Sequence, residues 1–390
     1  MSPFLSLEAH EWERFSVPHS VRLVGEEQHL LGAGSVSVAT TLRVHVEVEE
    51  TGGEFSLSFG GGPRDEDGRW QEVEEPLAEF AARWENAVHS VFADEPSAPE
   101  GLDIEVDFGP LWQVCPPGIL TASPAVAVAM AVAVAAHRGE GRQVAETELA
   151  ELACRLHYVA AGAGRSTEDR FYSDALLSII GGAGYVEPHG ERLNVQQLLP
   201  PEALLLVVMP GVEGAGAGHQ LDEAVLRARA KAKEAGGDLT QPGDAGFSAL
   251  FALADVALSR EEVAMLYGLM RVRQMVEGFL EHLGEPHVDN DRLAGICDEE
   301  SAILADYFGF PGAPYERVRA AAGKAGALGT KLTWAFGGYP AALVVAPGQR
   351  REAGEALTRT FPGLYCLLVD MDPAGLLRGE EEEAVLRDEF

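Results

Sequence analysis

The chain has 390 residues, 46% of them hydrophobic, and it carries 62 acidic against 29 basic side chains, a formal net charge of -33. Its length predicts two or three domains with a large buried core, while its acidity argues against nucleic acid and anionic membranes as main partners, because both need a basic surface. The cysteines are scattered without a CxxC pair, which argues against a disulfide framework or a zinc site and favours free thiols.

The N-terminal segment, MSPFLSLEAHEWERF, carries acidic residues where a signal peptide would carry basic ones. No apolar run reaches the ~20 residues that a membrane-spanning helix needs. We therefore expect a cytoplasmic protein that acts on a small-molecule substrate, with no nucleic acid and no membrane as partners. The sequence leaves the oligomeric state open.

The first half of the chain mixes strand and helix patterns. Alternation over 36–48 predicts a strand with one buried face, and 102–109 alternates in the same way. An apolar stripe over 70–94 predicts an amphipathic helix. The segment 116–125, PPGILTASPA, leads into a helix rich in alanine and valine, and 144–158 predicts the next helix.

The second half begins with an apolar stretch, LLLVVMP at 204–210, which predicts a short buried strand. The glycine-rich segment GVEGAGAG at 211–218 favours a domain junction. Beyond it the pattern is mainly helical to about residue 326. We expect two closing strands with a helix between them, at 331–346, 364–370 and 350–359 respectively.

The pattern as a whole is α+β, because strands and helices are mixed in both halves. We divide the chain into an N-terminal domain, 1–210, which contains the loop 116–125, and a C-terminal domain, 211–390. The C-terminal domain ends in an acidic tail, 379–390, which we expect to be solvated.

The loop 116–125 has two interpretations. A glycine-containing loop before a helix can bring backbone N–H groups close to a phosphate, and the hydroxyls of Thr121 and Ser123 could bind phosphate or Mg²⁺. Alternatively, Ser123 is an ordinary helix N-cap with Pro124 at the first helical position. The lysine of a Walker P-loop is missing, which excludes that motif.

Three segments together resemble the motifs of the galactokinase, homoserine kinase, mevalonate kinase and phosphomevalonate kinase superfamily, the GHMP kinases. They are VPHSVRLVGEEQHLLGAG at 17–34, PPGILTASPA at 116–125 and GALGTKLTWAFGGYPAALVVA at 326–346. Their order and spacing along the chain match the family. The first and third resemble the galactokinase branch most, and the resemblance covers nearly the whole chain.

The resemblance implies a two-domain GHMP kinase fold. The N-terminal domain would be like part of a ribosomal protein, and the C-terminal domain would be ferredoxin-like. ATP would lie between them with its phosphates on the second-motif loop, and a serine and a glutamate would hold Mg²⁺. An aspartate would act on the substrate hydroxyl while a basic residue stabilises the transferring phosphoryl group.

The resemblance assigns the second-motif loop to the ATP phosphates, and Ser123 to the magnesium ion. The Pro at 124 stands where the family has Ala and removes one backbone N–H. The cofactor-binding residues implied in this way are Pro117, Gly118, Leu120, Thr121, Ala122 and Ser123.

The catalytic aspartate of the family matches Asp169, in the stretch GAGRSTEDRFYSDALLSIIGG, with Asp174 as a nearby alternative. Arg170 replaces the family Gln. A surface aspartate in a polar loop is the alternative to a catalytic role.

The metal-binding glutamate of the family matches His157 or Tyr158, neither of which suits hard Mg²⁺. Glu148 and Glu151 lie earlier on the same predicted helix and could replace it. Their alternative role is a solvated helix face.

The first motif departs most from the family. Ser20 stands where the family has its catalytic Arg, and Arg22 stands two residues later, on the same face of a strand, where it could supply the missing charge. Glu26 matches the family Glu, whereas Glu27 and His29 replace the His and Asp that shape the sugar pocket of galactokinases. We take these three residues as substrate residues and expect a substrate other than galactose.

The third motif keeps Thr333, Gly337 and Gly338, which the resemblance assigns to the substrate loop. Trp334 and Phe336 replace small residues. Bulky side chains there would crowd a loop that approaches phosphate, or fill a site that is no longer used.

Two functions follow from these motifs. The first is a divergent kinase of carbohydrate metabolism, in which Asp169 acts on the substrate hydroxyl and Arg22, Arg170 or Lys331 neutralises charge on the γ-phosphate. The second is a pseudokinase that serves as a ligand sensor or an interaction protein, because charged residues are replaced in all three motifs. We favour the kinase, since Arg22 can replace the missing arginine.

Overall fold

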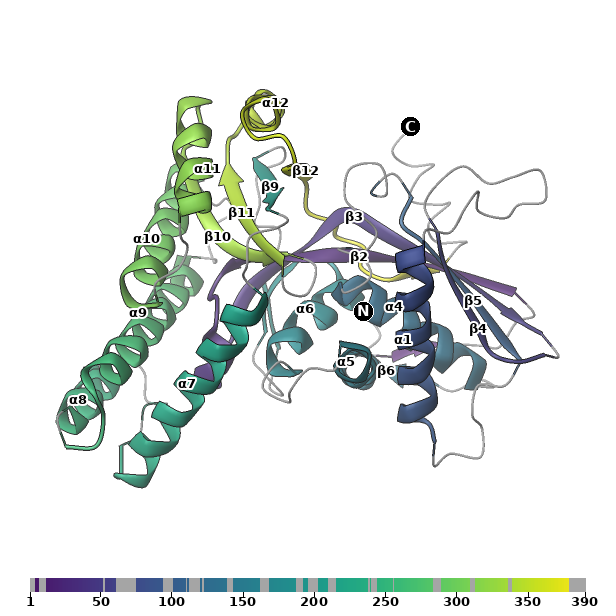
Figure 1. Cartoon of the computed structure of the whole chain (residues 1–390), viewed down its shortest axis with the longest axis horizontal. Helices are drawn as coiled ribbons and strands as arrows, with labels where there is room; N and C mark the ends of the chain where they lie inside the picture. Colours follow the sequence, from purple (N-terminus) through teal and green to yellow (C-terminus); the bar gives the residue numbers. More distant parts are fainter. Residues whose placement is uncertain are drawn as a thin grey trace. The chain divides into compact units, whose positions relative to one another are not determined.

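The computed structural model mixes helices and strands, as predicted (Figure 1). Among the residues that it describes, no helix has the length and apolar character needed to cross a membrane. The described residues are 4–6, 12–51, 53–60, 75–93, 101–109, 111, 120, 123–138, 143–161, 168–186, 192–195, 203–209, 215–237, 239, 244–254, 256–282, 289–308, 313–335 and 339–378.

The chain forms two compact units, which two long strands connect. The first unit comprises Met1–Ser20, Ala39–Gly182 and Asp372–Phe390, and the second comprises Val21–Val38 and Ala183–Met371. Strand β2 (Trp12–Val24) runs from the first unit into the second, and β3 (Ser35–Glu50) returns. This division differs from the boundary that we placed at 210, because strand pairing groups segments that are far apart in the sequence.

The first unit contains a mixed sheet and a group of helices. The sheet follows the order β13-β2-β3-β5-β4, with β4 and β5 parallel and the β3–β5 and β2–β13 pairs antiparallel. The short strands β1 and β6 pair with each other. The bounds are β1 Phe4–Ser6, β4 Ser56–Gly60, β5 Leu102–Asp107, β6 Gln143–Ala145, β13 Leu377–Arg378, α1 Glu75–Val91, α4 Pro124–Arg138, α5 Glu146–Ala161 and α6 Glu168–Ile180.

Helix α4 is the central helix of this unit. Every side chain from Ala125 to Val134 is buried, because the run of alanine and valine presents a small apolar surface on all sides. Helices α5 and α6 and strand β5 contact α4 (Figure 1). The helices predicted over 70–94 and 144–158 and the strand over 102–109 are confirmed as α1, α5 and β5.

The second unit combines an antiparallel sheet, in the order β10-β11-β9-β12, with a helical layer; β7 pairs with β8 and with the first residues of β3. The strand predicted over 204–210 is confirmed as β9. The bounds are β7 Ala183–Val186, β8 Arg192–Val195, β9 Leu204–Val208, β10 Gly329–Ala335, β11 Tyr339–Val345, β12 Tyr365–Val369, η1 Gln28–Leu31, α7 Ala215–Glu234, α8 Asp244–Leu253, α9 Arg260–His282, α10 Asn290–Phe308, α11 Ala313–Lys324 and α12 Arg350–Thr360.

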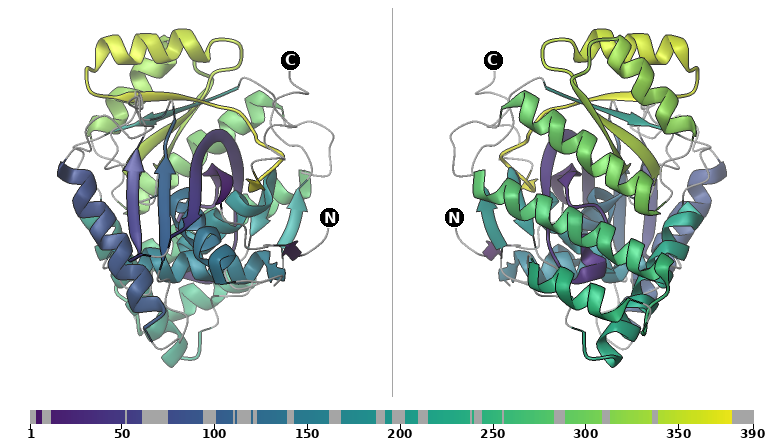
Figure 2. Two further views of the ribbon diagram at one scale, coloured as in Figure 1. Left: turned by 90° about the vertical axis from the view of Figure 1, so that its right-hand side faces the viewer. Right: turned by 90° about the vertical axis from the view of Figure 1, so that its left-hand side faces the viewer.

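The single strand predicted over 331–346 is wrong, because β10 and β11 are two antiparallel strands with Leu332 opposite Ala342. Leu332 and Ala342 also join the core that α11 and α12 form against one face of this sheet, where α12 packs on β9 and β12 (Figure 2). The acidic tail 379–390 lies outside the described residues.

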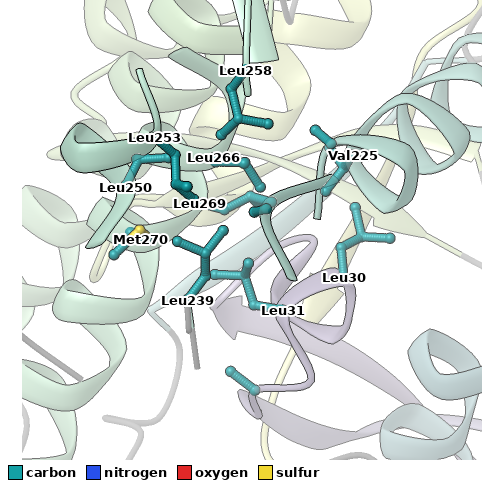
Figure 3. Close-up of a cluster of buried hydrophobic side chains, with 13 residues drawn as sticks. Leu30, Leu31, Val225, Leu239, Leu250, Leu253, Leu258, Leu266, Leu269 and Met270 are labelled. Atoms are coloured by element: carbon teal, nitrogen blue, oxygen red, sulfur yellow. The ribbon is translucent and has the colours of Figure 1, made fainter. Parts of the chain in front are cut away.

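A second core holds the short helix η1 against the helical layer of this unit. Leu30 and Leu31 of η1 enter a cluster of buried leucines from the layer (Figure 3). The labelled partners are Val225, Leu239, Leu250, Leu253, Leu258, Leu266, Leu269 and Met270. The segment that follows β2, which carries the first motif, is therefore fixed by apolar packing.

Candidate functional site

The N-terminus of α4 is built by Ser123. Its side chain is fully buried, and its Oγ accepts the N–H of Val126 at 3.3 Å. The Ser123 carbonyl accepts the N–H of Ala127, and the Ser123 N–H reaches the carbonyl of Leu120. Ser123 is thus a helix N-cap with Pro124 at the first helical position, which confirms the structural interpretation of this serine.

The same end of α4 also suits an anion. Its first turn contains no acidic side chain, and a helix N-terminus carries partial positive charge. A serine hydroxyl oxygen has two lone pairs, and the N-cap bond from Val126 uses one of them. Of the six residues that the resemblance assigns to the ATP loop, the structure describes two, Ser123 and the buried Leu120. The other four, Pro117, Gly118, Thr121 and Ala122, lie outside the described residues.

The first motif forms a tight turn between β2 and η1. Gly25 has φ +98°, and a Cβ there would lie 3.0 Å from atoms of Ser35 and Val276, so a residue with a side chain would be both strained and crowded at this position. Glu27 has φ 60°, and among the residues that the structure describes it is the one residue other than glycine with a positive φ. Such a conformation costs of order 1 kcal/mol or more and persists where surrounding contacts hold it.

Glu26 is the centre of a buried charged cluster. Its Oε1 accepts the hydroxyl of Thr333 at 2.6 Å and lies 3.4 Å from the Nζ of Lys331, while its Oε2 lies 3.5 Å from the guanidinium of Arg22. Arg22, Glu26 and Thr333 are each at most 5% exposed. The structure therefore brings together predicted residues of the first and third motifs, within the second unit.

Lys331 is fully buried and is not an open cation for a phosphate. Its Nζ lies 3.2 Å from the carbonyl of Arg22, 3.2 Å from Glu300 Oε2 and 3.4 Å from Glu26 Oε1. An ammonium group has three protons, and three acceptors surround this one. Of the three cations that the sequence offers for the γ-phosphate, Arg22, Arg170 and Lys331, the structure therefore disfavours Lys331, because the carboxylates that permit its burial also occupy it.

The pKa values of this pair follow from burial and charge. Burial raises the pKa of Glu300, with Lys331 opposing the shift. Burial alone would lower the pKa of the Lys331 ammonium, but Glu300 and Glu26 raise it above its usual value. Lys331 therefore stays charged at neutral pH.

Glu27 and His29 lie together in the same unit. The indole N–H of Trp334 donates to Glu27 Oε1 at 2.9 Å, and the Nδ1 of His29 lies 3.8 Å from Glu27 Oε2. The side chains of Glu27 and His29 are both buried. Trp334, which replaces a small residue in the third motif, thus contacts a predicted substrate residue; Phe336, Gly337 and Gly338 lie outside the described residues.

Asp169 lies in the first turn of α6, and its side chain is outside the described part of the chain. Asp174 lies further along the same helix and is partly buried. The hydroxyl of Ser20, at the position of the family Arg, donates to the backbone carbonyl of Asp174 at 3.0 Å. Ser20 therefore ties β2 to α6 and brings no charge.

The position of the family metal-binding glutamate is part of an aromatic core. The His157 ring stacks on Phe171 with centroids 3.8 Å apart, and burial lowers the pKa of His157 to about 4. A neutral imidazole in such surroundings does not suit Mg²⁺. Glu148 and Glu151 are exposed on α5, as a solvated helix face requires. Among the described residues no cluster of His, Cys, Asp and Glu could hold a metal ion.

Glu300 belongs to the buried charged cluster around Glu26 and Lys331, and the sequence analysis did not single it out. It follows Asp298 and Glu299 in an acidic helical run, and Glu299 is exposed, as such a residue usually is. The partner of Glu300, the Glu26 backbone, lies 274 residues away in the chain. No local signal separates Glu300 from its solvated neighbours.

No protein-family model matches the chain, and no curated protein sequence matches it. Solved structures do match. Lactococcus lactis galactokinase, complexed with galactose, has a TM-score of 0.70 at 15% identity and covers 95% of each chain. Methanococcus jannaschii mevalonate kinase has a TM-score of 0.57 at 14% identity, over 92% of this chain and 98% of the other.

A third structure, L. major mevalonate kinase in complex with R-mevalonate, has a TM-score of 0.57 at 15% identity, over 91% of this chain and 94% of the other. These three structures are all GHMP kinases, and each is covered almost completely. The chain therefore has the GHMP kinase fold, as its motifs predict.

Proposed function

We propose that this chain is an ATP-dependent kinase that phosphorylates a hydroxyl group of a small metabolite such as a sugar. The observation that carries the proposal is the fold: the chain is similar to kinases of small hydroxylated molecules over more than nine tenths of its length. The N-terminus of α4, with its N-cap hydroxyl and no acidic side chain in its first turn, is a suitable phosphate site.

The roles follow the motifs. The loop before α4 would hold the ATP phosphates, and the Ser123 hydroxyl would hold Mg²⁺. ATP would supply the phosphoryl group, and Mg²⁺, when bound, would neutralise phosphate charge. Asp169 would accept the proton of the substrate hydroxyl, and Arg22 would supply positive charge from the first motif.

Galactose is not the substrate that we propose. Glu26 accepts hydrogen bonds within the chain, from Thr333, and also pairs with Lys331 and Arg22. Glu27 binds the indole of Trp334. A hydroxyl that bound these carboxylates would have to displace buried partners, which costs a free energy comparable to a lost hydrogen bond each time. We therefore propose a substrate with a hydroxyl pattern different from that of galactose.

Calorimetric titration with a non-hydrolysable ATP analogue tests the nucleotide site, with and without Mg²⁺. Ser123→Ala and Ser123→Gly form a matched pair, because both remove the hydroxyl but glycine is the better N-cap, by several tenths of a kcal/mol or more. We expect wild-type binding to depend on Mg²⁺ and both variants to lose that dependence. Binding that is absent at millimolar nucleotide would overturn the proposal, as would equal Mg²⁺ dependence in all three proteins.

A second function, a pseudokinase that binds ligand without transferring phosphate, has its own supporting observation. Ser20 occupies the position of the family Arg and is bound to the Asp174 carbonyl, while Lys331 is buried among carboxylates. An arginine that stabilises a phosphoryl-transfer transition state is worth about 10³–10⁵ in rate where it has been removed or supplied. This function would be favoured if the protein binds the ATP analogue but releases no ADP from ATP in any pool of substrates.

A further inference from the structure

Glu300 of α10 lies directly against the turn that carries the first motif. Its side chain is fully buried, and one oxygen, Oε1, accepts two successive backbone N–H groups, from Gly25 at 2.9 Å and Glu26 at 2.7 Å. Its other oxygen lies 3.2 Å from the Nζ of Lys331. One carboxylate thus binds the turn and the lysine at the same time.

Burying this carboxylate is costly. The effective penalty for moving an ion out of water is several kcal/mol, and a buried pair can often be replaced by apolar residues with no loss of stability. Stability alone therefore does not explain an acidic residue at this place. What the carboxylate does, and an apolar side chain could not, is to accept the two N–H groups of a turn in a restricted conformation.

The backbone N–H groups of Gly25 and Glu26 need an acceptor from outside the turn, because the turn does not continue the strand pairing of β2. Gly25 has φ +98° and Glu27 has φ 60°, so the segment leaves the strand geometry of β2 at this point. Adjacent N–H groups in such a turn point in similar directions and form a natural anion-binding concavity. Glu300 occupies that concavity from inside the protein.

The turn fixes the side chains for which we propose a catalytic or substrate role. Arg22 precedes it on β2 and pairs with Glu26, while Glu27 reaches Trp334 from the strained position. Lys331 binds the carbonyl of Arg22 at 3.2 Å and so connects Glu300 to the strand as well.

We propose that Glu300 is a positioning residue for phosphoryl transfer: its Oε1 fixes the Gly25–Glu27 turn, and through the turn it sets the places of Arg22 and Glu26. The effect on transfer rests on the proposed function, whereas the effect on the turn does not.

The experiment compares two double variants that both lack the buried charge pair. Glu300→Gln with Lys331→Met retains a side-chain oxygen that can accept both N–H groups. Glu300→Ala with Lys331→Met removes that oxygen in the same background. The readout is ¹⁹F NMR of protein labelled with 5-fluorotryptophan, because the Trp334 indole binds Glu27 in the turn. Trp334→Phe assigns the resonance.

We expect the Trp334 resonance to keep its wild-type shift in the Gln–Met variant and to move or broaden in the Ala–Met variant, while the other tryptophan resonances stay unchanged in both. A Trp334 resonance that is unchanged in both variants, or equally shifted in both, would overturn the role of the Glu300 oxygen. If the Ala–Met variant does not fold, Glu300→Asp, which keeps the charge but shortens the reach, should shift the same resonance; an unshifted resonance would also overturn the proposal.

Phosphoryl transfer is then measured on the same proteins with a substrate that the wild type accepts. We expect kcat within tenfold of wild type for the Gln–Met variant and a loss of at least 100-fold for the Ala–Met variant, with similar Kd for the ATP analogue. Equal kcat in the two variants would overturn the positioning role. A wild type that neither binds nor transfers would overturn the proposed function alone, because the ¹⁹F result still tests the turn.

Discussion

Replacing Lys331 by methionine tests the buried cluster most sharply. Lys331 Nζ has Glu300, Glu26 and the Arg22 carbonyl within 3.4 Å and is fully buried. Methionine keeps an unbranched side chain of similar length but removes the charge, so the fully buried Glu300 carboxylate loses its lysine partner. Breaking a buried pair in this way costs about 3–5 kcal/mol.

The cost should depend on pH in a defined direction. Burial raises the pKa of Glu300 above its unfolded value, so the stability linked to this group is fully present below the unfolded pKa and is lost as pH rises through the folded pKa. Removal of the lysine raises the folded pKa further, because the cation no longer favours the carboxylate. The penalty of Lys331→Met should therefore be largest at alkaline pH, and it should shrink as pH falls and the buried Glu300 carboxyl takes up a proton.

Urea unfolding followed by fluorescence gives the free energy at each pH. Lys231→Met is the matched control, because Lys231 forms a surface ion pair with Glu262 and is 53% exposed; it should cost less than about 1 kcal/mol. Adding Glu300→Gln to Lys331→Met should recover about 0.5–3 kcal/mol, the usual range for coupled neighbours. A Lys331→Met penalty as small as that of Lys231→Met, and flat with pH, would refute the reasoning.

Three further predictions concern other parts of the chain. Native His157 stays neutral to about pH 4, whereas in the unfolded chain it takes up a proton below about pH 6.5. The free energy of unfolding should therefore be highest above pH 6.5 and fall by up to about 3 kcal/mol toward pH 4. In denaturant titrations His157→Phe should reduce this dependence on pH, and an unchanged dependence would contradict the burial of His157. Gly25→Ala, at φ +98° with neighbours 3.0 Å from the new Cβ, should lower the free energy of unfolding by about 1–3 kcal/mol and shift the Trp334 resonance; a neutral effect would contradict the turn. Leu269→Ala, in the core that holds η1 (Figure 3), should cost about 2–5 kcal/mol in urea unfolding, and a cost under 1 kcal/mol would contradict that packing.

Much of the fold could be predicted because its elements repeat a local pattern. The alternation of β5 and the apolar stripe of α1 each follow from one buried face. The N-cap at Ser123 follows from the known preference for serine at the N-cap of a helix. The hairpin β10–β11 is harder to predict: Gly337 and Gly338 are a turn signal, but the many apolar residues on both sides of the pair also fit one continuous strand.

The site was less predictable because its charges pair over long distances. Lys331 has the sequence features of an exposed cation, and it is buried only because Glu26 and Glu300 come from elsewhere in the chain to meet it. The grouping into units follows the same kind of long-range contact: strand pairing joins Val21–Val38 to Ala183–Met371, and no composition change marks Ser20 or Gly182 as a boundary.

Phosphoryl transfer itself is the most direct test of the proposed function. The measurement is ³¹P NMR of the protein with Mg²⁺ and ATP in the presence of pooled sugars and other small hydroxylated metabolites, with Asp169→Asn as the matched protein. We predict a new phosphomonoester resonance together with ADP in one pool for the wild type, and neither for Asp169→Asn. Binding of nucleotide with no new phosphomonoester in any pool, or equal transfer by Asp169→Asn, would contradict the proposed kinase mechanism.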